Sequence, residues 1–313
     1  MKIGVDILGG DFAPDATVKG AILAFKELPA SSKLVLIGDR EKINLICNQQ
    51  GFDASVFEII HTTENIQMHE QPAKAFASKP NASIPIGFNM LKVGQIDGFA
   101  SAGNTGAMMV GAMMVIKTIP GVIRACIASP MPNGTDTPTT LLDVGVNPDA
   151  RFDMLCQYAM LGSLYAHYVS GIANPRVGLM SIGAEEEKGN LVTKATFQAL
   201  RESNVVNFIG NIEGHDLFTN EKVDVIVCDG FVGNVILKEA EAFYNLLKKR
   251  EIHDPVFEQF NFENIGGTPV LGINSTAIIG HGVSNDKAIK SMILQANHVV
   301  ESGLIEKIKE AFK

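Results

Sequence analysis

The feature that most constrains the fold of this chain is the regular alternation of short apolar runs with longer amphipathic segments. Several of the short runs are apolar almost throughout, as in KLVLIG (33–38) and DVIVCD (224–229). Continuous apolar runs are typical of strands that are buried on both faces of a parallel sheet. Strand–helix alternation of this kind predicts a layered α/β fold, an αβα arrangement with a mostly parallel sheet.

The expected strands and helices follow one another along the whole chain. The strands are expected at 2–7, 33–38, 57–61, 98–101, 125–129, 139–144, 176–182, 206–211, 224–229 and 270–279. The helices are expected at 14–28, 40–51, 83–94, 105–118, 149–172, 189–202, 233–250 and 284–312. We expect one catalytic domain, residues 1–313, with a central cleft. The segment 240–264 breaks the alternation and is interpreted as a short helical excursion within that domain.

The charge balance and the cysteines exclude several classes of protein. Lys and Arg number 26 against 34 Asp and Glu, which gives a net charge of −8 and no long basic run. Nucleic-acid binding requires clustered basic residues, so it is not expected. The four cysteines form no C-x-x-C pair and are expected to be buried, reduced thiols. The N-terminus does not resemble a signal peptide, and no apolar run reaches the length of a membrane span, so a cytoplasmic protein is expected.

The residues that follow the expected strands are rich in glycine and small polar side chains. This composition occurs at 6–11, 101–106, 143–147, 183–190, 211–214, 229–234 and 280–284. In α/β sheets, ligands bind beyond the carboxyl ends of the strands. Bare backbone and helix-capping side chains at such ends present N–H groups to an anion. The sequence therefore predicts a cleft that binds an anion or a phosphate group.

The common catalytic motifs are missing from the sequence. It contains no G-x-G-x-x-G, no P-loop, no G-x-S-x-G and no H-E-x-x-H. A nicotinamide cofactor, a bound metal and a covalent nucleophile therefore have no support, and no cofactor is expected. The chemistry that remains is one in which the substrate is itself the nucleophile and the protein supplies positioning and charge stabilisation.

Taken together, these stretches resemble the acyl-carrier-protein:phosphate acyltransferase family of bacterial phospholipid synthesis. The resemblance covers nearly the whole chain, and the matching segments occur in the family's order. They are GVDILGGDFAPDATVKGA (4–21), FASAGNTGAMM (99–109), LLDVGVN (141–147), RVGLMSIGAEEEKGN (176–190), NFIGNIEGHD (207–216), VDVIVCDGFVGNVILK (223–238) and GGTPVLGINSTAIIGHG (266–282).

The resemblance implies a fold, a reaction and a set of partners. The fold would be that of isocitrate and isopropylmalate dehydrogenases, which phosphotransacetylases share. In the reaction, inorganic phosphate would attack the thioester of a long-chain acyl-carrier protein and yield acyl phosphate and free carrier. The expected partners are acyl-carrier protein, inorganic phosphate, a second copy in a homodimer, and a downstream membrane acyltransferase.

Three residues are the candidate catalytic groups. Lys188 would stabilise the anionic transition state, or else form a surface ion pair with the glutamates at 185–187. Asn234 would donate a hydrogen bond to the thioester carbonyl, or else cap a helix. His281 would protonate the departing thiolate, or else be a structural histidine.

The candidate substrate-binding residues share a place at the expected strand ends, and two of them, Asn104 and Thr105, would hold phosphate at the start of a helix. The carboxylates would fix loops or orient lysines, because a negative side chain repels phosphate. The full set is Asp11, Asn104, Thr105, Asn147, Asn190, Asn211, Asp229 and Ser284.

Two other functions fit the same residues. One is a phosphotransacetylase-type enzyme that moves acyl groups between coenzyme A and phosphate, and the other is a non-catalytic scaffold that binds acyl-carrier protein. In the family the segment corresponding to 240–264 forms a protruding hairpin linked to dimer contact and membrane attachment. It is shorter here, which leaves peripheral membrane association open. The basic cluster Lys248-Lys249-Arg250 would meet the acidic carrier, anionic lipid or only solvent.

Overall fold

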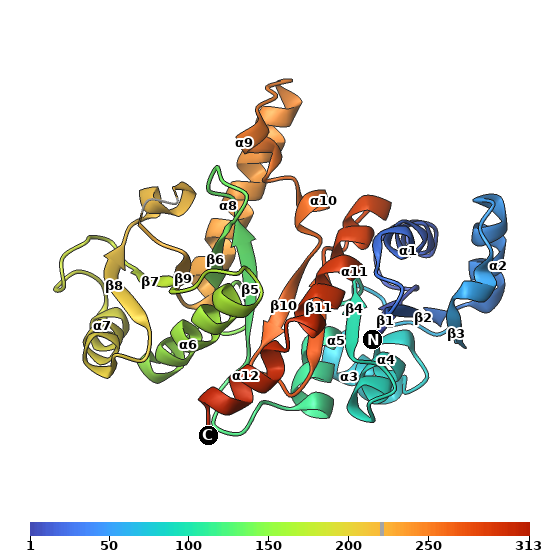
Figure 1. Cartoon of the computed structure of the whole chain (residues 1–313), viewed down its shortest axis with the longest axis horizontal. Coiled ribbons are helices and arrows are strands. Elements are labelled where there is room, and N and C mark those ends of the chain that lie inside the picture. The colour runs from blue at the N-terminus through green and yellow to red at the C-terminus, as the bar shows by residue number, and fades with distance from the viewer. Residues whose placement is uncertain (220–221) are drawn as a thin grey trace. The chain divides into compact units, whose positions relative to one another are not determined.

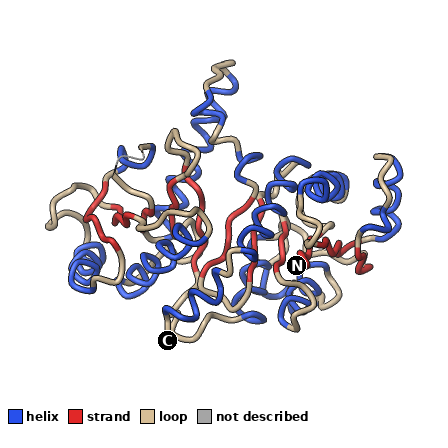
Figure 2. The backbone as a smooth tube through the Cα atoms, in the orientation of Figure 1, coloured by secondary structure: helices blue, strands red, loops and turns tan. Residues whose placement is uncertain are grey.

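The computed structural model describes residues 1–219 and 222–313. The chain forms two compact units. Unit 1 consists of Met1–Thr118 and Phe262–Glu301, and unit 2 consists of Ile119–Asn261 and Ser302–Lys313. In each unit helices pack against a sheet (Figures 1 and 2). The single catalytic domain with a central cleft stays a prediction.

The sheet of unit 1 has the strand order β3–β2–β1–β4–β11–β10. All neighbouring strands are parallel except β10 and β11. Val5 at the centre of the sheet lies opposite Leu36 of β2 and Ala100 of β4, and all three side chains are fully buried. The strands are β1 (Lys2–Asp6), β2 (Lys33–Gly38), β3 (Glu58–His61), β4 (Gly98–Ser101), β10 (Gly267–Leu271) and β11 (Thr276–Gly280).

Helices cover both faces of the unit 1 sheet. On β4, Gly98 faces Val300, which lies in the C-terminal part of α11. Phe99 of the same strand packs against Phe88 of α4, with ring centroids 5.2 Å apart. Successive residues of a strand point to opposite faces, so α11 and α4 lie on opposite sides of the sheet. The helices are α1 (Asp15–Glu27), α2 (Arg40–Gln49), η1 (Ala54–Val56), α3 (Pro72–Ser78), α4 (Ser83–Lys92), α5 (Thr105–Val110), η2 (Gly111–Ile116), α10 (Phe262–Ile265) and α11 (Asp286–Glu301).

The sheet of unit 2 has the strand order β5–β6–β9–β7–β8. Its strands are parallel except for the antiparallel pair β5 and β6. The strands are β5 (Cys126–Met131), β6 (Thr139–Leu142), β7 (Arg176–Met180), β8 (Asn207–Ile212) and β9 (Val225–Val227). The helices are α6 (Phe152–Tyr168), α7 (Leu191–Ser203), η3 (Gly214–Phe218), α8 (Gly230–Lys249), α9 (Pro255–Glu258) and α12 (Leu304–Ala311).

The layered α/β fold with mostly parallel strands is confirmed, with two corrections near the C-terminus. The strand expected at 270–279 is wrong: β10 and β11 are two antiparallel strands joined by a turn that contains Gly272 at φ +86°. The helix expected at 284–312 is also divided, because Gly303 at φ +66° ends α11 and precedes α12. Left-handed backbone of this kind is where glycine commonly terminates a helix.

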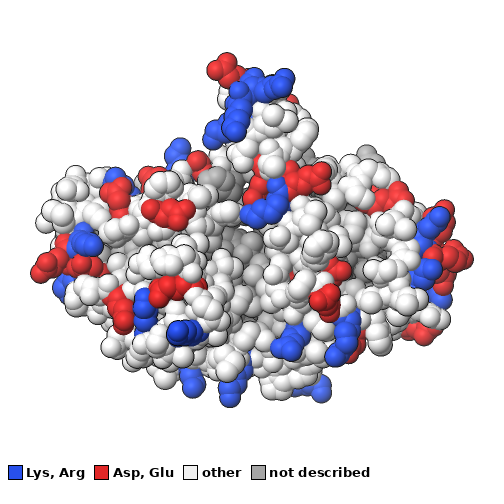
Figure 3. Space-filling model, turned by 180° about the vertical axis from the view of Figure 1, so that it is seen from behind, with Lys and Arg blue, Asp and Glu red and all other residues white. Residues whose placement is uncertain are grey.

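The expected excursion at 240–264 contains the second half of α8 and the short α9. Lys and Arg side chains gather at the far end of this helical segment (Figure 3), where Lys248 and Lys249 stand in the last turn of α8. Basic residues in a last turn also complement the helix dipole, so a structural role accounts for part of this cluster. Within the residues that the structure describes, no helix has both the length and the apolar character needed to cross a bilayer.

Candidate functional site

In unit 1, the residues that follow β1, β4 and β11 lie side by side. These three neighbouring strands are parallel, so their carboxyl ends meet at one edge of the sheet. The backbone N–H of Asp11 donates to the carbonyl oxygen of Gly282 at 2.8 Å. Gly9 lies so close to the β4 end that an added Cβ would fall 2.7 Å from the Gly103 nitrogen. The edge is therefore built from closely packed bare backbone, as the sequence predicts.

A buried carboxylate, Asp6, ties two of these strand ends together. Ser101 Oγ donates to Asp6 Oδ2 at 2.7 Å, and the Leu8 N–H donates to Asp6 Oδ1 at 3.0 Å. Burial raises the pKa of Asp6 above its ordinary value, although the hydrogen bonds from Ser101 and Leu8 oppose the rise. Asp6 is only 1% exposed and serves as an internal anchor of the loop.

The amide of Asn104 is fully engaged within unit 1. Its Oδ1 accepts from the Ala107 N–H at 2.9 Å and so caps α5, while its Nδ2 lies 3.0–3.3 Å from the carbonyl oxygens of residues 67, 68 and 70. Thr105, the first residue of α5, is exposed. The structure thus places Thr105 on the surface and uses the Asn104 side chain to hold the 67–70 segment.

His281 and Ser284 occupy the turn after β11. The Ser284 N–H donates to the His281 carbonyl at 3.0 Å. The His281 side chain is exposed, whereas Ser284 is 3% exposed, and its buried Oγ has no hydrogen-bond partner among the described residues. Of the two, only the imidazole faces solvent.

In unit 2, the parallel strands β6, β9, β7 and β8 also end at one edge. The Gly230 N–H donates to the Asn147 carbonyl at 2.8 Å, which joins the loops that follow β9 and β6. The Asn211 side chain donates to the Glu185 carbonyl at 2.9 Å and joins β8 to the loop after β7. The predicted residues of unit 2 are therefore brought to neighbouring loops.

Asp143 and Asn147 stabilise the loop after β6. Asp143 is completely buried, and its Oδ2 accepts from the Asn147 backbone N–H at 2.7 Å and from Asn147 Nδ2 at 3.0 Å. Asn147 Nδ2 also donates to the Ala125 carbonyl at 2.8 Å. A Cβ on Gly233 would overlap the Asp143 carbonyl oxygen, so only glycine lets the first turn of α8 pack this closely.

Asp229 and Asn234 divide two roles at the start of α8. Asp229 is the cap, because its Oδ1 accepts from the Val232 N–H at 2.8 Å. The alternative role of Asn234 as a helix cap is therefore wrong, since Asn234 stands in the second turn. Its side chain is exposed, and its Oδ1 would lie 3.4 Å from a Cβ placed on Gly145. Asn234 thus stands over the loop that follows β6.

Lys188 lies on the exposed loop between β7 and α7. Its backbone N–H donates to the Glu185 carbonyl at 3.1 Å. No ion pair joins its ammonium to the neighbouring glutamates within the described part of the chain, and Glu186 pairs with Arg201 instead. Asn190 caps α7, with its Oδ1 accepting from the Thr193 N–H at 2.9 Å. The loop therefore presents an exposed ammonium beside a capped helix.

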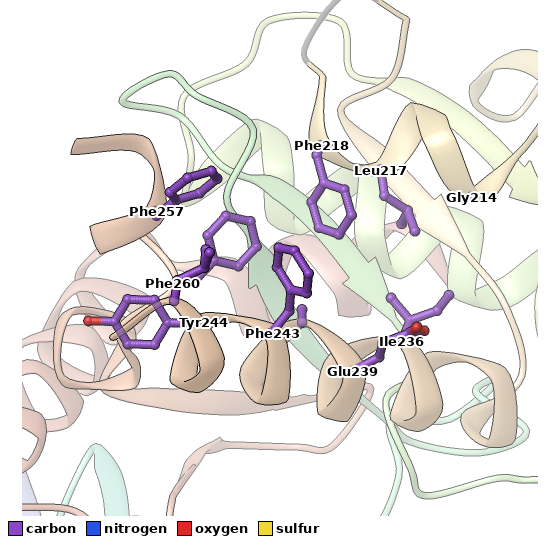
Figure 4. Close-up of a pocket in the computed structure, with 11 residues that line it drawn as sticks. Gly214, Leu217, Phe218, Ile236, Glu239, Phe243, Tyr244, Phe257 and Phe260 are labelled. Atoms are coloured by element: carbon purple, nitrogen blue, oxygen red, sulfur yellow. The ribbon is translucent and has the colours of Figure 1, made fainter. Parts of the chain in front are cut away.

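An apolar pocket of about 400 Å³ in unit 2 has no counterpart among the sequence-based predictions (Figure 4). Its walls come from η3, α8, α9 and the residues just after α9, so they join segments that are separate in the sequence. The available sequence signal was the apolar face of α8, where Ile236, Ala240, Phe243 and Leu247 recur at helical spacing.

Similarity to known proteins extends over the whole chain. The family described as Fatty acid synthesis protein matches residues 1–307. A phosphate acyltransferase of Desulfitobacterium hafniense is 40% identical, and the match covers 99% of this chain and 97% of that protein. A phosphate acyltransferase of Dictyoglomus turgidum is 39% identical with the same coverage.

Solved structures with the same fold are more distant in sequence. A phosphotransacetylase from Streptococcus pyogenes has a TM-score of 0.68 at 17% identity and covers 96% of this chain and 94% of its own. EutD phosphotransacetylase from Staphylococcus aureus has a TM-score of 0.66 at 16% identity with the same coverage. The fold is thus shared with phosphotransacetylases, and the sequence similarity assigns the chain more narrowly. This chain belongs to the phosphate acyltransferase family of fatty acid and phospholipid synthesis.

Proposed function

We propose that this chain transfers a long-chain fatty acyl group from acyl-carrier protein to inorganic phosphate. An oxygen of hydrogenphosphate forms a bond to the thioester carbon, and the carbon–sulfur bond breaks. The acyl phosphate keeps the new carbon–oxygen bond, and the proton of hydrogenphosphate ends on the carrier thiol. The observation that carries the proposal is the identity of about 40% over nearly the full length to relatives named phosphate acyltransferase.

The demands of this reaction agree with the groups at the strand ends. Hydrogenphosphate supplies its own nucleophilic oxygen, so the protein needs no covalent nucleophile. It has to position the phosphate against the uncharged thioester and stabilise the negative charge that develops on the thioester oxygen. Backbone N–H groups, one exposed ammonium and exposed amides are the groups suited to this task.

In unit 2 we propose that Lys188 and Asn234 act on the thioester. The ammonium of Lys188 would stabilise the anionic transition state, and Asn234 Nδ2 would donate to the thioester carbonyl oxygen. Among the residues that the structure describes, Lys188 forms no ion pair with its neighbouring glutamates, and Asn234 is not used as a cap, which supports these roles. Asn147, Asn190, Asn211 and Asp229 then act as positioning residues, because their side chains hold loops and helix starts.

In unit 1 the corresponding roles are phosphate binding and proton transfer. Thr105 would bind phosphate through its hydroxyl, with Asn104 and Asp11 positioning the loops around it. The exposed imidazole of His281 would protonate the departing thiolate and take up the proton of hydrogenphosphate in its place, and Ser284 would support its turn. We further propose a homodimer that passes acyl phosphate to a downstream membrane acyltransferase, either in the cytoplasm or at the membrane surface.

The test is product trapping. The purified chain is incubated with phosphate and either a long-chain acyl-carrier protein or the matching acyl-CoA, and hydroxylamine converts acyl phosphate to a hydroxamate for mass spectrometry. Phosphate-dependent hydroxamate from the carrier substrate is expected. Turnover of acyl-CoA alone would replace the proposal with a phosphotransacetylase-type activity. A folded preparation that binds carrier but yields no product from either donor would identify a scaffold.

A further inference from the structure

We propose that Met68 in unit 1 is a specificity-determining residue that favours phosphate over water as the nucleophile; this rests on the proposed function. The 65–70 segment holds the Met68 side chain against the turn formed by His281 and Gly282. There it keeps water from competing with phosphate for the acyl thioester.

The 65–70 segment crosses the carboxyl edge of the unit 1 sheet. It follows β3, the outermost strand in the order β3–β2–β1–β4–β11 (Figure 1). The Thr62 N–H donates to the carbonyl oxygen of Gly38, at the end of β2, at 3.0 Å. Farther along, Asn65 Nδ2 donates to the Leu8 carbonyl, just after β1, at 3.1 Å. The chain therefore runs from the edge of the sheet toward the strand ends that form the candidate site.

Beyond β1, the same segment is bound by the loop after β4 and reaches the turn after β11. Asn104 Nδ2 lies 3.0–3.3 Å from three carbonyl oxygens of the segment. A Cβ placed on Gly282 would lie 2.9 Å from Met68 Cε, so the Met68 methyl group rests against the backbone of this turn. Gly282 directly follows His281. Met68 therefore lies beside the residue that we propose as the proton donor to the thiolate.

Hydrogen bonds and an ion pair within unit 1 fix the shape of the segment. Glu70 Oε2 accepts from the Gln67 N–H at 2.7 Å and pairs with Lys79 Nζ at 2.7 Å. Lys79 Nζ also donates to the Asn65 carbonyl at 3.1 Å, so a single ammonium joins the two ends of the segment. The position of Met68 is thus set by contacts on both sides of it.

Water is the nucleophile that competes with phosphate for the thioester. When a water oxygen bonds to the thioester carbon and the carbon–sulfur bond breaks, the products are a fatty acid and the carrier thiol, with one proton of water on each. A neutral imidazole can accept a proton from water, so His281 would also assist hydrolysis wherever water reaches it. Exclusion of water from the reacting centre prevents this side reaction.

The Met68 side chain is chemically suited to exclude water. It is 47% exposed and stands between the polar residues Gln67 and His69. Its thioether sulfur is only a weak hydrogen-bond acceptor, and its methylene and methyl groups neither donate nor accept. The segment therefore presents an apolar surface beside the His281 turn.

The test measures both products from one donor. Wild type and variants are incubated with hexadecanoyl carrier and phosphate, the reaction is stopped within the first turnovers, and acyl phosphate and free fatty acid are quantified by mass spectrometry. For Met68→Ala we expect the ratio of free fatty acid to acyl phosphate to rise by about 10-fold. Met68→Gln, which adds polar atoms at the same length, should also raise it.

Two further variants are controls. Met68→Leu keeps the apolar volume and should keep the wild-type ratio. Met114→Ala removes an exposed methionine of unit 1 that lies outside the segment, in η2, and should also leave the ratio unchanged. Urea unfolding checks the fold, and Met68→Ala should match the wild type because the side chain is half exposed.

The product ratio separates this inference from the proposed reaction. Acyl phosphate from the wild type supports the reaction by itself, and an unchanged ratio in Met68→Ala and Met68→Gln would then overturn only the inference. The inference is also overturned if these two variants slow both products by the same factor, since Met68 would then act on the rate and not on the choice of nucleophile. Free fatty acid as the sole product of the wild type would overturn the proposed reaction and the inference together.

Discussion

At the scale of single residues, Lys188 carries the strongest prediction. Its side chain is exposed and forms no ion pair with the adjacent glutamates, so its removal should leave stability unchanged. Loss of one group that stabilises transition-state charge lowers kcat by about 10²–10³-fold. We expect that loss for Lys188→Ala in the phosphate-dependent assay. The matched control is Lys194→Ala, another exposed lysine of unit 2; equal activity of the two variants would contradict the assignment.

Asp229 and Asn234 should separate stability from activity. Asp229 caps α8, so Asp229→Ala should lower the free energy of unfolding by about 1 kcal/mol. Asn234 is exposed in the next turn, so Asn234→Ala should unfold like the wild type in urea and still lose turnover. If Asn234→Ala were the less stable variant and kept full activity, the two roles would have to be exchanged.

The Arg176–Asp224 pair predicts a pH dependence of stability. Burial acts to raise the pKa of Asp224, but the hydrogen bonds from Arg176 outweigh it and hold this pKa below its ordinary value. A depressed carboxyl pKa stabilises the fold above the unfolded-state pKa, and this stabilisation is lost as the pH falls through the folded-state pKa. At neutral pH the free energy of unfolding of Asp224→Asn should therefore be about 1–3 kcal/mol lower than that of the wild type.

The urea unfolding curves of this variant and the wild type should begin to converge once the pH falls below the ordinary pKa of aspartate, about 3.9, and the convergence should be complete below the depressed pKa of Asp224 in the folded state. A difference that stayed constant from neutral pH to acid would show that charge on Asp224 has no part in it.

At the scale of elements, Asn104 links α5 to the 67–70 segment. Asn104→Ala removes one cap and the hydrogen bonds to three backbone carbonyls, so this segment should exchange its amide hydrogens faster. The expected loss of stability is about 1–2 kcal/mol. Mass spectrometry of hydrogen exchange would check this, with the β7–β8 region of unit 2 as the internal reference. Unchanged exchange at 67–70 would contradict the proposed link.

The elements that sequence predicts best are those with a continuous apolar pattern. β1, β2 and β9 coincide closely with their apolar runs because both of their faces are buried. The pattern fails where a local backbone conformation decides the outcome. The apolar run at 270–279 shows no sign of the turn at Gly272, and the amphipathic pattern of 284–312 continues through Gly303. Both glycines take positive φ, which the apolar pattern does not indicate.

The location of the candidate site can be predicted from the sequence, but the roles of its individual residues are harder to predict. Parallel strands bring their carboxyl ends to one edge, so the strand-end loops within each unit could be identified from sequence. An Asn or Asp at the start of a helix can cap the helix or bind a ligand, and only the hydrogen bonds of its side chain in the structure distinguish the two roles. Here Asn104, Asn190 and Asp229 are caps, whereas Asn234 is not.

At the scale of the molecule, the two units carry different candidate groups for the proposed reaction. Unit 1 offers a closely packed backbone edge with an exposed histidine, and unit 2 offers Lys188 and Asn234. The apolar pocket of unit 2 could not be predicted because its walls, 214–218, 236–247 and 257–260, are brought together only by folding. The reaction proposed for the whole chain is attack of phosphate itself on the acyl thioester.

This attack is measured most directly with phosphate labelled with heavy oxygen. The full chain is incubated with long-chain acyl-carrier protein and labelled phosphate, and the intact acyl phosphate is detected by mass spectrometry. We predict a product that carries all the label of the phosphate and forms at the rate at which carrier thiol appears. Release of carrier thiol with free fatty acid, and no labelled acyl phosphate, would contradict it.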